Sequence, residues 1–211
     1  IPDANLRHYN SMLRGLADVG KELNEHMHSF QIMFGNAEEI IPILARDALE
    51  LVLDHGYLRY QRLWRETIYQ NIPSNTNYTE IDTEAVVPVH LVSDKEEYSA
   101  ATIRKKILKS LPEWLYSENS SLQVSNANKI ENSVFPCYRG SYSDYSELWD
   151  WAKDKLYAQN IMPLATFQGA YSNAITLLDD FIGYKLMQYS KLRNHPELSY
   201  QSNLSPYLHF G

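Results

Sequence analysis

The sequence predicts an α/β fold in which a parallel sheet is followed by a region built of helices alone. Between residues 30 and 81, short apolar runs alternate with helix-like segments, and strands joined through helices pair in parallel. After residue 143 only helical periodicity remains. A doubly wound sheet usually has more strands than these, so we expect one or two N-terminal strands to be missing from this chain.

The predicted elements are justified in order along the chain. Residues 4–25 form an amphipathic helix, because their apolar side chains recur every three to four residues. Phe30 to Phe34 is a short apolar run typical of a strand, which Gly35 and Asn36 end. The same reasoning predicts helix 37–47, strand 49–53, helix 57–71, strand 78–81, helix 95–110, helix 144–159 and helix 168–190.

A long segment without periodicity separates the two regions. Residues 117–143 are rich in Ser and Asn, which is typical of a linker between domains. The predicted organisation is therefore an α/β domain at 1–116, a linker at 117–143 and the beginning of a helical domain at 144–211.

Composition limits the classes of function. The formal net charge of −7 argues against a protein that clamps DNA with its overall charge, although a local basic groove stays possible. The single cysteine, Cys137, permits no internal disulfide and indicates a reducing compartment. No apolar run approaches the ~20 residues of a membrane span. We expect a cytoplasmic, nucleoid-associated protein, or a nuclear one if the source is eukaryotic.

Few residues point to metal or acid–base chemistry. His26 and His28 lie two residues apart with no acidic or cysteine partner in evidence, so no metal site is expected. The basic cluster of Lys105, Lys106 and Lys109 fits either the solvated end of a helix or a face toward DNA. The chain opens with Ile1-Pro2 instead of Met, and we expect the true N-terminus to lie outside it.

The C-terminal stretch carries the most chemical information. Gln201 to Ser205 is a polar, turn-prone run that could offer backbone N–H groups and two hydroxyls to an anion. It could equally cap a new helix, with Ser202 or Ser205 as the cap and Pro206 at the first helical position. The residues alone leave both interpretations open.

Two separated blocks resemble the class II DNA photolyases of the cryptochrome/photolyase family. The end of the chain, SNLSPYLHFG, resembles the segment that opens the family's flavin-binding helical domain, and residues 189–196 resemble its Tyr-x-x-x-Arg-Asn-x-Pro element. Residues 86–107 resemble the class II pattern of VVP followed by S-x-K-x-E-Y-x-A-x-T-x-R-x-K, with Asp82 at the family's spacing before it. The resemblance covers nearly the whole chain and is weakest in 117–165.

The resemblance implies a Rossmann-like parallel sheet domain followed by the start of an all-α flavin-binding domain. It implies FAD as cofactor, with the diphosphate held by Tyr189, Ser202, Asn203, Leu204 and Ser205. Arg193 matches a family arginine near the flavin and the DNA, although a cation at a helix C-terminus explains it equally well. An antenna pigment, deazaflavin or folate, is also implied, and no residue identifies it.

The implied activity is that of a deoxyribodipyrimidine photo-lyase. Such an enzyme repairs cyclobutane pyrimidine dimers in double-stranded DNA by light-driven electron transfer from reduced FAD, acting as a monomer on a flipped-out dimer. The catalytic residues are expected beyond residue 211, so this chain alone should bind FAD weakly or not at all. The alternatives are a cryptochrome-like blue-light receptor and a truncated photolyase-like protein without enzymatic activity.

Overall fold

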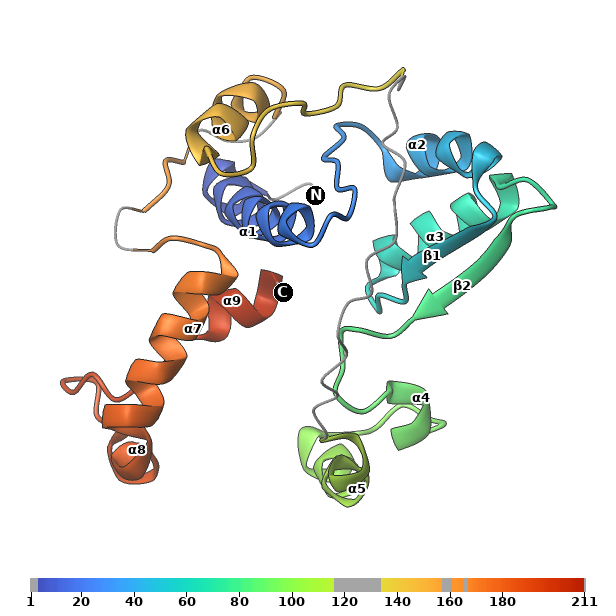
Figure 1. Cartoon of the computed structure of the whole chain (residues 1–211). Helices are drawn as coiled ribbons and strands as arrows, with labels where there is room; N and C mark the ends of the chain where they lie inside the picture. Colours follow the sequence, from blue (N-terminus) through green and yellow to red (C-terminus); the bar gives the residue numbers. More distant parts are fainter. Residues whose placement is uncertain (1–3, 116–133, 157–160, 165–166, 211) are drawn as a thin grey trace. The chain divides into compact units, whose positions relative to one another are not determined.

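A computed structural model describes residues 4–115, 134–156, 161–164 and 167–210, and the side chains up to Leu208. The chain divides into two compact units (Figure 1). Unit 1 comprises Ile1–Phe34 and Leu122–Gly211, and unit 2 comprises Gly35–Ser121.

Unit 2 contains the predicted parallel sheet. Strands β1 (Glu50–Asp54) and β2 (Asn77–Ile81) pair in parallel, with Glu50 opposite Asn77 and Asp54 opposite Ile81. Helix α3 (Arg59–Asn71) connects them, as a parallel pair requires (Figure 1). The α/β class with parallel strands is therefore confirmed.

Helices complete unit 2 around this sheet. Helix α2 (Ala37–Leu44) packs on α3, burying Ile40 and Pro42 on one side and Ile68 on the other. A single 3-10 turn (Ala45–Asp47) leads from α2 into β1. Beyond β2 lie the short helix α4 (Val89–Val92) and the longer helix α5 (Ala100–Trp114).

Helix α5 runs further than predicted. Residues 95–110 were expected to be helical, whereas the helix begins at Ala100 and continues through Pro112 to Trp114. A proline near a helix end removes only one intrahelical hydrogen bond, and the backbone N–H of Leu115 still donates to the carbonyl of Leu111 at 2.9 Å. The start is late because Ser99 caps the helix.

Unit 1 is built around the first helix. Helix α1 (Leu6–Glu25) starts at Asn5, whose side chain accepts from the backbone N–H groups of Arg7 at 3.0 Å and His8 at 3.3 Å. Helix α6 (Tyr145–Lys153) packs against it. The buried core between them comprises Leu13, Ala17, Ile32, Tyr138, Tyr142, Leu148 and Ala152, with Trp149 and Trp151 partly buried against it.

The strand predicted at Phe30–Phe34 is not a regular strand. Met33 forms an isolated antiparallel bridge with Cys137, and the Phe34 N–H donates to the Pro136 carbonyl at 2.9 Å. The prediction was wrong because this apolar run pairs with a distant irregular segment and not with β1. Its apolar side chains, among them Ile32, enter the core of unit 1.

The compact units also cut the chain differently from the predicted domains. Helix α1 shares a core with α6, and Tyr138 and Tyr142, placed in the predicted linker, are buried there. Residues 117–133 of that linker lie outside the described residues. The boundaries at 1–116, 117–143 and 144–211 stay a prediction.

Candidate functional site

A long helical run leads to the predicted cofactor residues. Helix α7 (Tyr171–Asp180), the π-helical turn η2 (Phe181–Lys185) and helix α8 (Leu186–Leu192) follow one another without a break. The Lys185 ammonium lies 2.8 Å from the Asp180 carboxylate across the π-helical turn. Such turns are frequent at functional sites because they change which side chains share a helix face.

Tyr189 and Arg193 lie together on this run. They are four residues apart on neighbouring turns, and the Arg193 guanidinium is 5.7 Å from the centre of the Tyr189 ring. The centres of the Tyr189 and Phe181 rings are 5.3 Å apart, and the two ring planes are nearly perpendicular, at 86°. Within the part of the chain that the structure describes, the Tyr189 hydroxyl has no hydrogen-bond partner and no carboxylate pairs with Arg193.

A polar turn connects α8 to the last helix, α9 (Ser205–Phe210). The Gln201 side-chain amide donates to the backbone carbonyl of Arg193, which ties the two ends of the turn together. Inside the turn, the His195 N–H donates to the Leu192 carbonyl at 3.0 Å. These bonds keep the serine-containing segment near the C-terminal end of α8.

The segment 202–205 presents backbone donors. Asn203 has φ of +57°, in the left-handed region that Asn tolerates better than most residues. The Leu204 N–H is directed toward the Ser202 hydroxyl at 3.5 Å. Among the described residues, no acceptor exists for the backbone N–H groups of Asn203, Ser205 and Tyr207. Donors of this kind, beside two hydroxyls, suit an anionic oxygen.

Helix α9 is anchored from the other side. The Tyr207 hydroxyl donates to the Gln168 carbonyl at 2.9 Å, and the Tyr207 ring packs on Phe167 at 5.0 Å. Helix α1 fixes the start of α7, because the Asp18 carboxylate accepts from the backbone N–H of Ser172 at 3.2 Å and from its hydroxyl at 2.9 Å.

The structure thus brings the predicted residues together in two groups. Tyr189 and Arg193 form one group, and Ser202, Asn203, Leu204 and Ser205 form the other. Within the described ranges, no hydrogen bond links Tyr189 directly to the second group, and the residue before that group, Gln201, donates to the Arg193 carbonyl. The assignment of Tyr189 and residues 202–205 to the cofactor, and of Arg193 to the DNA side, stays a prediction.

Unit 2 holds a polar cluster that the sequence analysis missed. The Glu80 carboxylate lies 2.8 Å from His55 Nδ1, accepts from the Tyr78 hydroxyl at 2.9 Å and lies 3.3 Å from Arg65 Nε. Burial opposes ionisation of Glu80, but these three partners outweigh it and lower its pKa. Burial and the bond to Glu80 raise the pKa of Tyr78 to about 12. The signal was available, since polar residues at the carboxyl ends of parallel strands converge.

Asp82 takes part in a second contact of this kind. The Tyr57 hydroxyl donates to the Asp82 carboxylate, and burial together with this bond raises the pKa of Tyr57. The motif had placed Asp82 only by its spacing, without a partner.

The block at 86–107 contains an ion pair that sequence reasoning did not identify. The Lys106 ammonium lies 2.5 Å from a carboxylate oxygen of Glu97, which also accepts from the Ser93 hydroxyl at 2.7 Å. Hydrogen bonds from Lys106, Ser93 and Thr102 lower the pKa of Glu97 to about 2. Lys105 and Lys109 are exposed, so Lys106 differs from the other two lysines of its cluster.

Two features are absent from the described part of the chain. It contains no group of three or more His, Cys, Asp and Glu side chains able to hold a metal ion. None of its helices has the length and apolar character of a membrane span.

Comparison with known proteins places these features in a family. The family model described as DNA photolyase matches residues 3–129. The deoxyribodipyrimidine photo-lyase of Methanothermobacter thermautotrophicus is 30% identical over 210 residues, which is 100% of this chain and 44% of that protein. The corresponding protein of Potorous tridactylus is 27% identical over 216 residues, covering 99% of this chain and 37% of its own length.

A solved structure supports the fold. A crystal structure of an archaeal photolyase from Sulfolobus tokodaii, described as holding two FAD molecules, superimposes with a TM-score of 0.64 at 15% identity. The match covers 98% of this chain and 41% of that one. The chain spans less than half the length of each of these relatives. Because the family model matches more than half of the residues of this chain, the chain belongs to the DNA photolyase family.

Proposed function

We propose that the chain supplies the α/β part and the first FAD-binding residues of a class II photolyase that repairs cyclobutane pyrimidine dimers in DNA. The observation that carries the proposal is the turn at 202–205, which follows the Tyr189–Arg193 pair along the chain and in which the backbone N–H groups of Asn203 and Ser205 have no acceptor among the described residues. Membership of the DNA photolyase family supports the choice of FAD as the ligand.

The residues present fit the diphosphate of FAD. The N–H groups of Asn203 and Ser205, with no acceptor among the described residues, could donate to phosphate oxygens, as backbone donors in left-handed turns do in other anion sites. The hydroxyls of Ser202 and Ser205 add donors, and the hydroxyl of Tyr189 can reach an anion without breaking a bond recorded in the structure. Arg193 would add positive charge near the cofactor or the DNA.

The chemistry of the reaction would come from the bound group. Bound FAD in its reduced form would supply the light-driven electron transfer that opens the cyclobutane ring. The residues of this chain would bind and orient the FAD. The turn would hold the diphosphate, and the ring of Tyr189, fixed by Phe181, would keep its hydroxyl in place. The same proposal includes an antenna pigment, either deazaflavin or folate. It also includes that the protein acts as a monomer on duplex DNA that contains pyrimidine dimers.

The test replaces the aligned part of the Methanothermobacter photolyase by this chain, since the whole chain aligns with that protein. We expect the hybrid to bind FAD and to repair an oligonucleotide with one cyclobutane dimer under near-ultraviolet light. Replacing both Ser202 and Ser205 by Ala should lower FAD occupancy about tenfold or more, because several hydrogen bonds to a charged group are lost. Ser190→Ala, an exposed serine of α8 outside the turn, is the matched control.

Three other outcomes of the hybrid experiment would each favour or refute a different alternative. A folded hybrid that holds stoichiometric FAD without repairing dimers would favour a cryptochrome-like receptor. A folded hybrid that holds no FAD would refute the proposed cofactor site. Repair of (6–4) photoproducts in place of cyclobutane dimers would refute the class II assignment and retain the flavin.

A further inference from the structure

The exposed face of helix α5 carries a row of cations. Its exposed positions recur at a spacing of three and four residues, so they lie on one side of the helix. These positions are Ala101, Arg104, Lys105, Leu108 and Lys109. The other side is partly buried, and α5 packs against α4. We call Arg104, Lys105 and Lys109 the basic face of α5.

The position of these cations in the helix does not explain them. A cation in the last turn of a helix is stabilised by the partial negative charge of the C-terminus, and this effect falls off within that turn. The last turn of α5 contains no basic residue, because the helix continues past Lys109 to Trp114. Lys105 and Lys109 are also four residues apart, a spacing at which like charges destabilise a helix. The interpretation of the cluster as a helix end therefore loses its physical basis.

The basic face has no anionic partner within the described part of the chain. Lys106, which lies outside this face, is bound to the Glu97 carboxylate at 2.5 Å. No described carboxylate forms an ion pair with the basic face, and this includes Glu113, four residues beyond Lys109. The chain as a whole has a formal net charge of −7. The basic face is therefore a local positive surface on an acidic chain.

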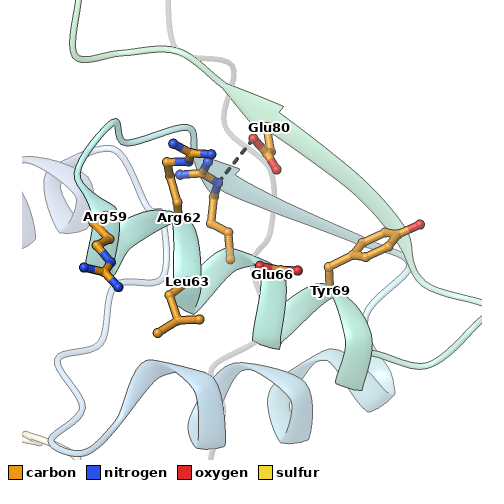
Figure 2. A pocket seen from close by; sticks show the side chains of 7 residues that line it. Arg59, Arg62, Leu63, Glu66, Tyr69 and Glu80 are labelled. Carbon is orange, nitrogen blue, oxygen red and sulfur yellow. Dashed lines mark ion pairs between the residues drawn. The ribbon is translucent and has the colours of Figure 1, made fainter.

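The arginines of helix α3 form no comparable surface. Figure 2 shows the side chains of Arg59 and Arg62 pointing in different directions. The third arginine, Arg65, lies 3.3 Å from the Glu80 carboxylate, the ion pair drawn in Figure 2, and donates to the Gly56 carbonyl at 2.7 Å. The exposed cations of α3 thus have the same charge as those of α5 without a shared direction, which makes them a suitable control.

We propose that the basic face of α5 binds the phosphate backbone of double-stranded DNA, where the choice of DNA as the polyanion rests on the proposed function. Arg104 and Lys109 are about 7.5 Å apart along the helix axis. Each strand of a duplex carries one phosphate per about 3.4 Å of its axis, so the three cations can contact successive phosphates. Phosphate contacts carry no sequence information. The basic face therefore increases the affinity for damaged and undamaged duplex equally.

The test measures binding of the whole chain to a short, undamaged, fluorescently labelled duplex by anisotropy at several salt concentrations. Three phosphate contacts should give a slope of about −2.7 in the logarithm of the binding constant against the logarithm of salt concentration. Replacing Arg104, Lys105 and Lys109 together by Gln should remove most of this slope and weaken binding about tenfold or more at about 50 mM salt. Gln has a helix propensity close to that of Lys and Arg, and far-ultraviolet circular dichroism verifies that the variant is folded.

The matched control replaces Arg46, Arg59 and Arg62 together by Gln. It removes the same three charges from exposed positions of the same unit, and it should leave the slope as it is in the natural chain. A variant with both Lys105→Arg and Lys109→Arg, which keeps the charge of the basic face, should retain the affinity for DNA.

Three outcomes would overturn the proposal. The first is absence of duplex binding at low salt, and the second is an equal loss of affinity in the control variant. The third is a preference for vesicles of phosphatidylcholine and phosphatidylserine over duplex DNA, which would assign the basic face to a membrane surface. FAD does not enter this measurement. A hybrid protein without FAD or repair would therefore refute the proposed function and leave the result on α5 unchanged.

Discussion

The Glu97 side chain depends on partners from the segments on either side of it in the chain. Its carboxylate accepts hydrogen bonds from the ammonium of Lys106, nine residues later in the chain, and from the hydroxyl of Ser93. The three residues lie in the family-like block at 86–107, where they connect the segment after α4 to helix α5. The motif therefore includes an ion pair that stabilises the fold. This structural role is sufficient to explain why Glu97 and Lys106 occur in the motif.

This ion pair leads to a prediction on pH dependence. The pKa of Glu97 is lowered to about 2, against about 4.3 in an unfolded chain. A lowered pKa stabilises the folded state above the unfolded value, and this contribution is lost as the pH falls from about 4.3 to about 2. Lys106→Met should reduce stability at pH 7 and flatten this acid-side loss. Urea unfolding at several pH values measures it.

Lys105→Met, at an exposed neighbouring lysine, is the control and should leave the pH profile as it is in the natural chain. If Lys106→Met and the natural chain lost stability in parallel between pH 5 and pH 2, the assignment of the pKa shift to this pair would be wrong.

At the scale of elements, the two long helical segments of unit 1 are stabilised differently. Helix α1 buries Asn10, Ser11, Leu13, Ala17 and Gly20 in the unit, whereas the run from α7 through α8 has no buried residue among those described. Helical stability in proteins comes mainly from packing of one face, so α1 is held by its core. Exposed apolar side chains on the other run, such as Tyr184 and Met187, lack that support here.

The packing of α1 predicts opposite effects for two of its glycines. A Cβ at Gly20 would lie 2.6 Å from the Tyr142 ring, whereas a Cβ at Gly15 would meet nothing within 4 Å. Gly20→Ala should therefore destabilise the chain by about 1–3 kcal/mol through overpacking. Gly15→Ala should stabilise it by up to ~1 kcal/mol, because Ala is the better helix former. Chemical denaturation measures both free energies of unfolding.

Gly15→Ala is the matched control, since it makes the same change in the same helix. Equal effects at the two positions would show that Tyr142 does not pack on α1 as described.

At the scale of the whole molecule, the chain carries only part of what its relatives contain. It aligns over its whole length with 44% of the Methanothermobacter photolyase and over 99% of its length with 37% of the Potorous enzyme. The proposed flavin contacts come from one turn and from one tyrosine, which lies on a helical run that is otherwise exposed. Such contacts would cover only one side of a ligand. Affinity requires enclosure, and a ligand site normally buries most of its ligand's surface.

The isolated chain is accordingly expected to bind FAD weakly or not at all. After purification with added FAD and gel filtration, the absorbance in the flavin bands should correspond to far less than one FAD per chain. The hybrid protein described above is the positive control. Stoichiometric flavin on the isolated chain would contradict this expectation and would show that the turn and its neighbours form a complete site.

Local patterns were sufficient to predict most elements. The helices at 6–25, 37–44 and 59–71 and the parallel strands at 50–54 and 77–81 follow from periodicity and from turn residues, which act within a few positions of the chain. The resemblance of 86–107 and 189–211 to photolyases was also visible in the sequence. The family model, which matches residues 3–129, and the Methanothermobacter relative, which aligns with the whole chain, confirm the family and leave the class as a proposal.

Tertiary structure alone decided the contacts between distant segments. Nothing in the apolar run at 30–34 could reveal that it would bridge to Cys137 and not join the sheet, because a strand pattern does not name its partner. The burial of Tyr138 and Tyr142 in a segment with linker composition and the Glu97–Lys106 pair depend likewise on which segments meet. Sequence determines local conformation through short-range sterics and periodicity, while burial and charge pairing are set by the whole fold.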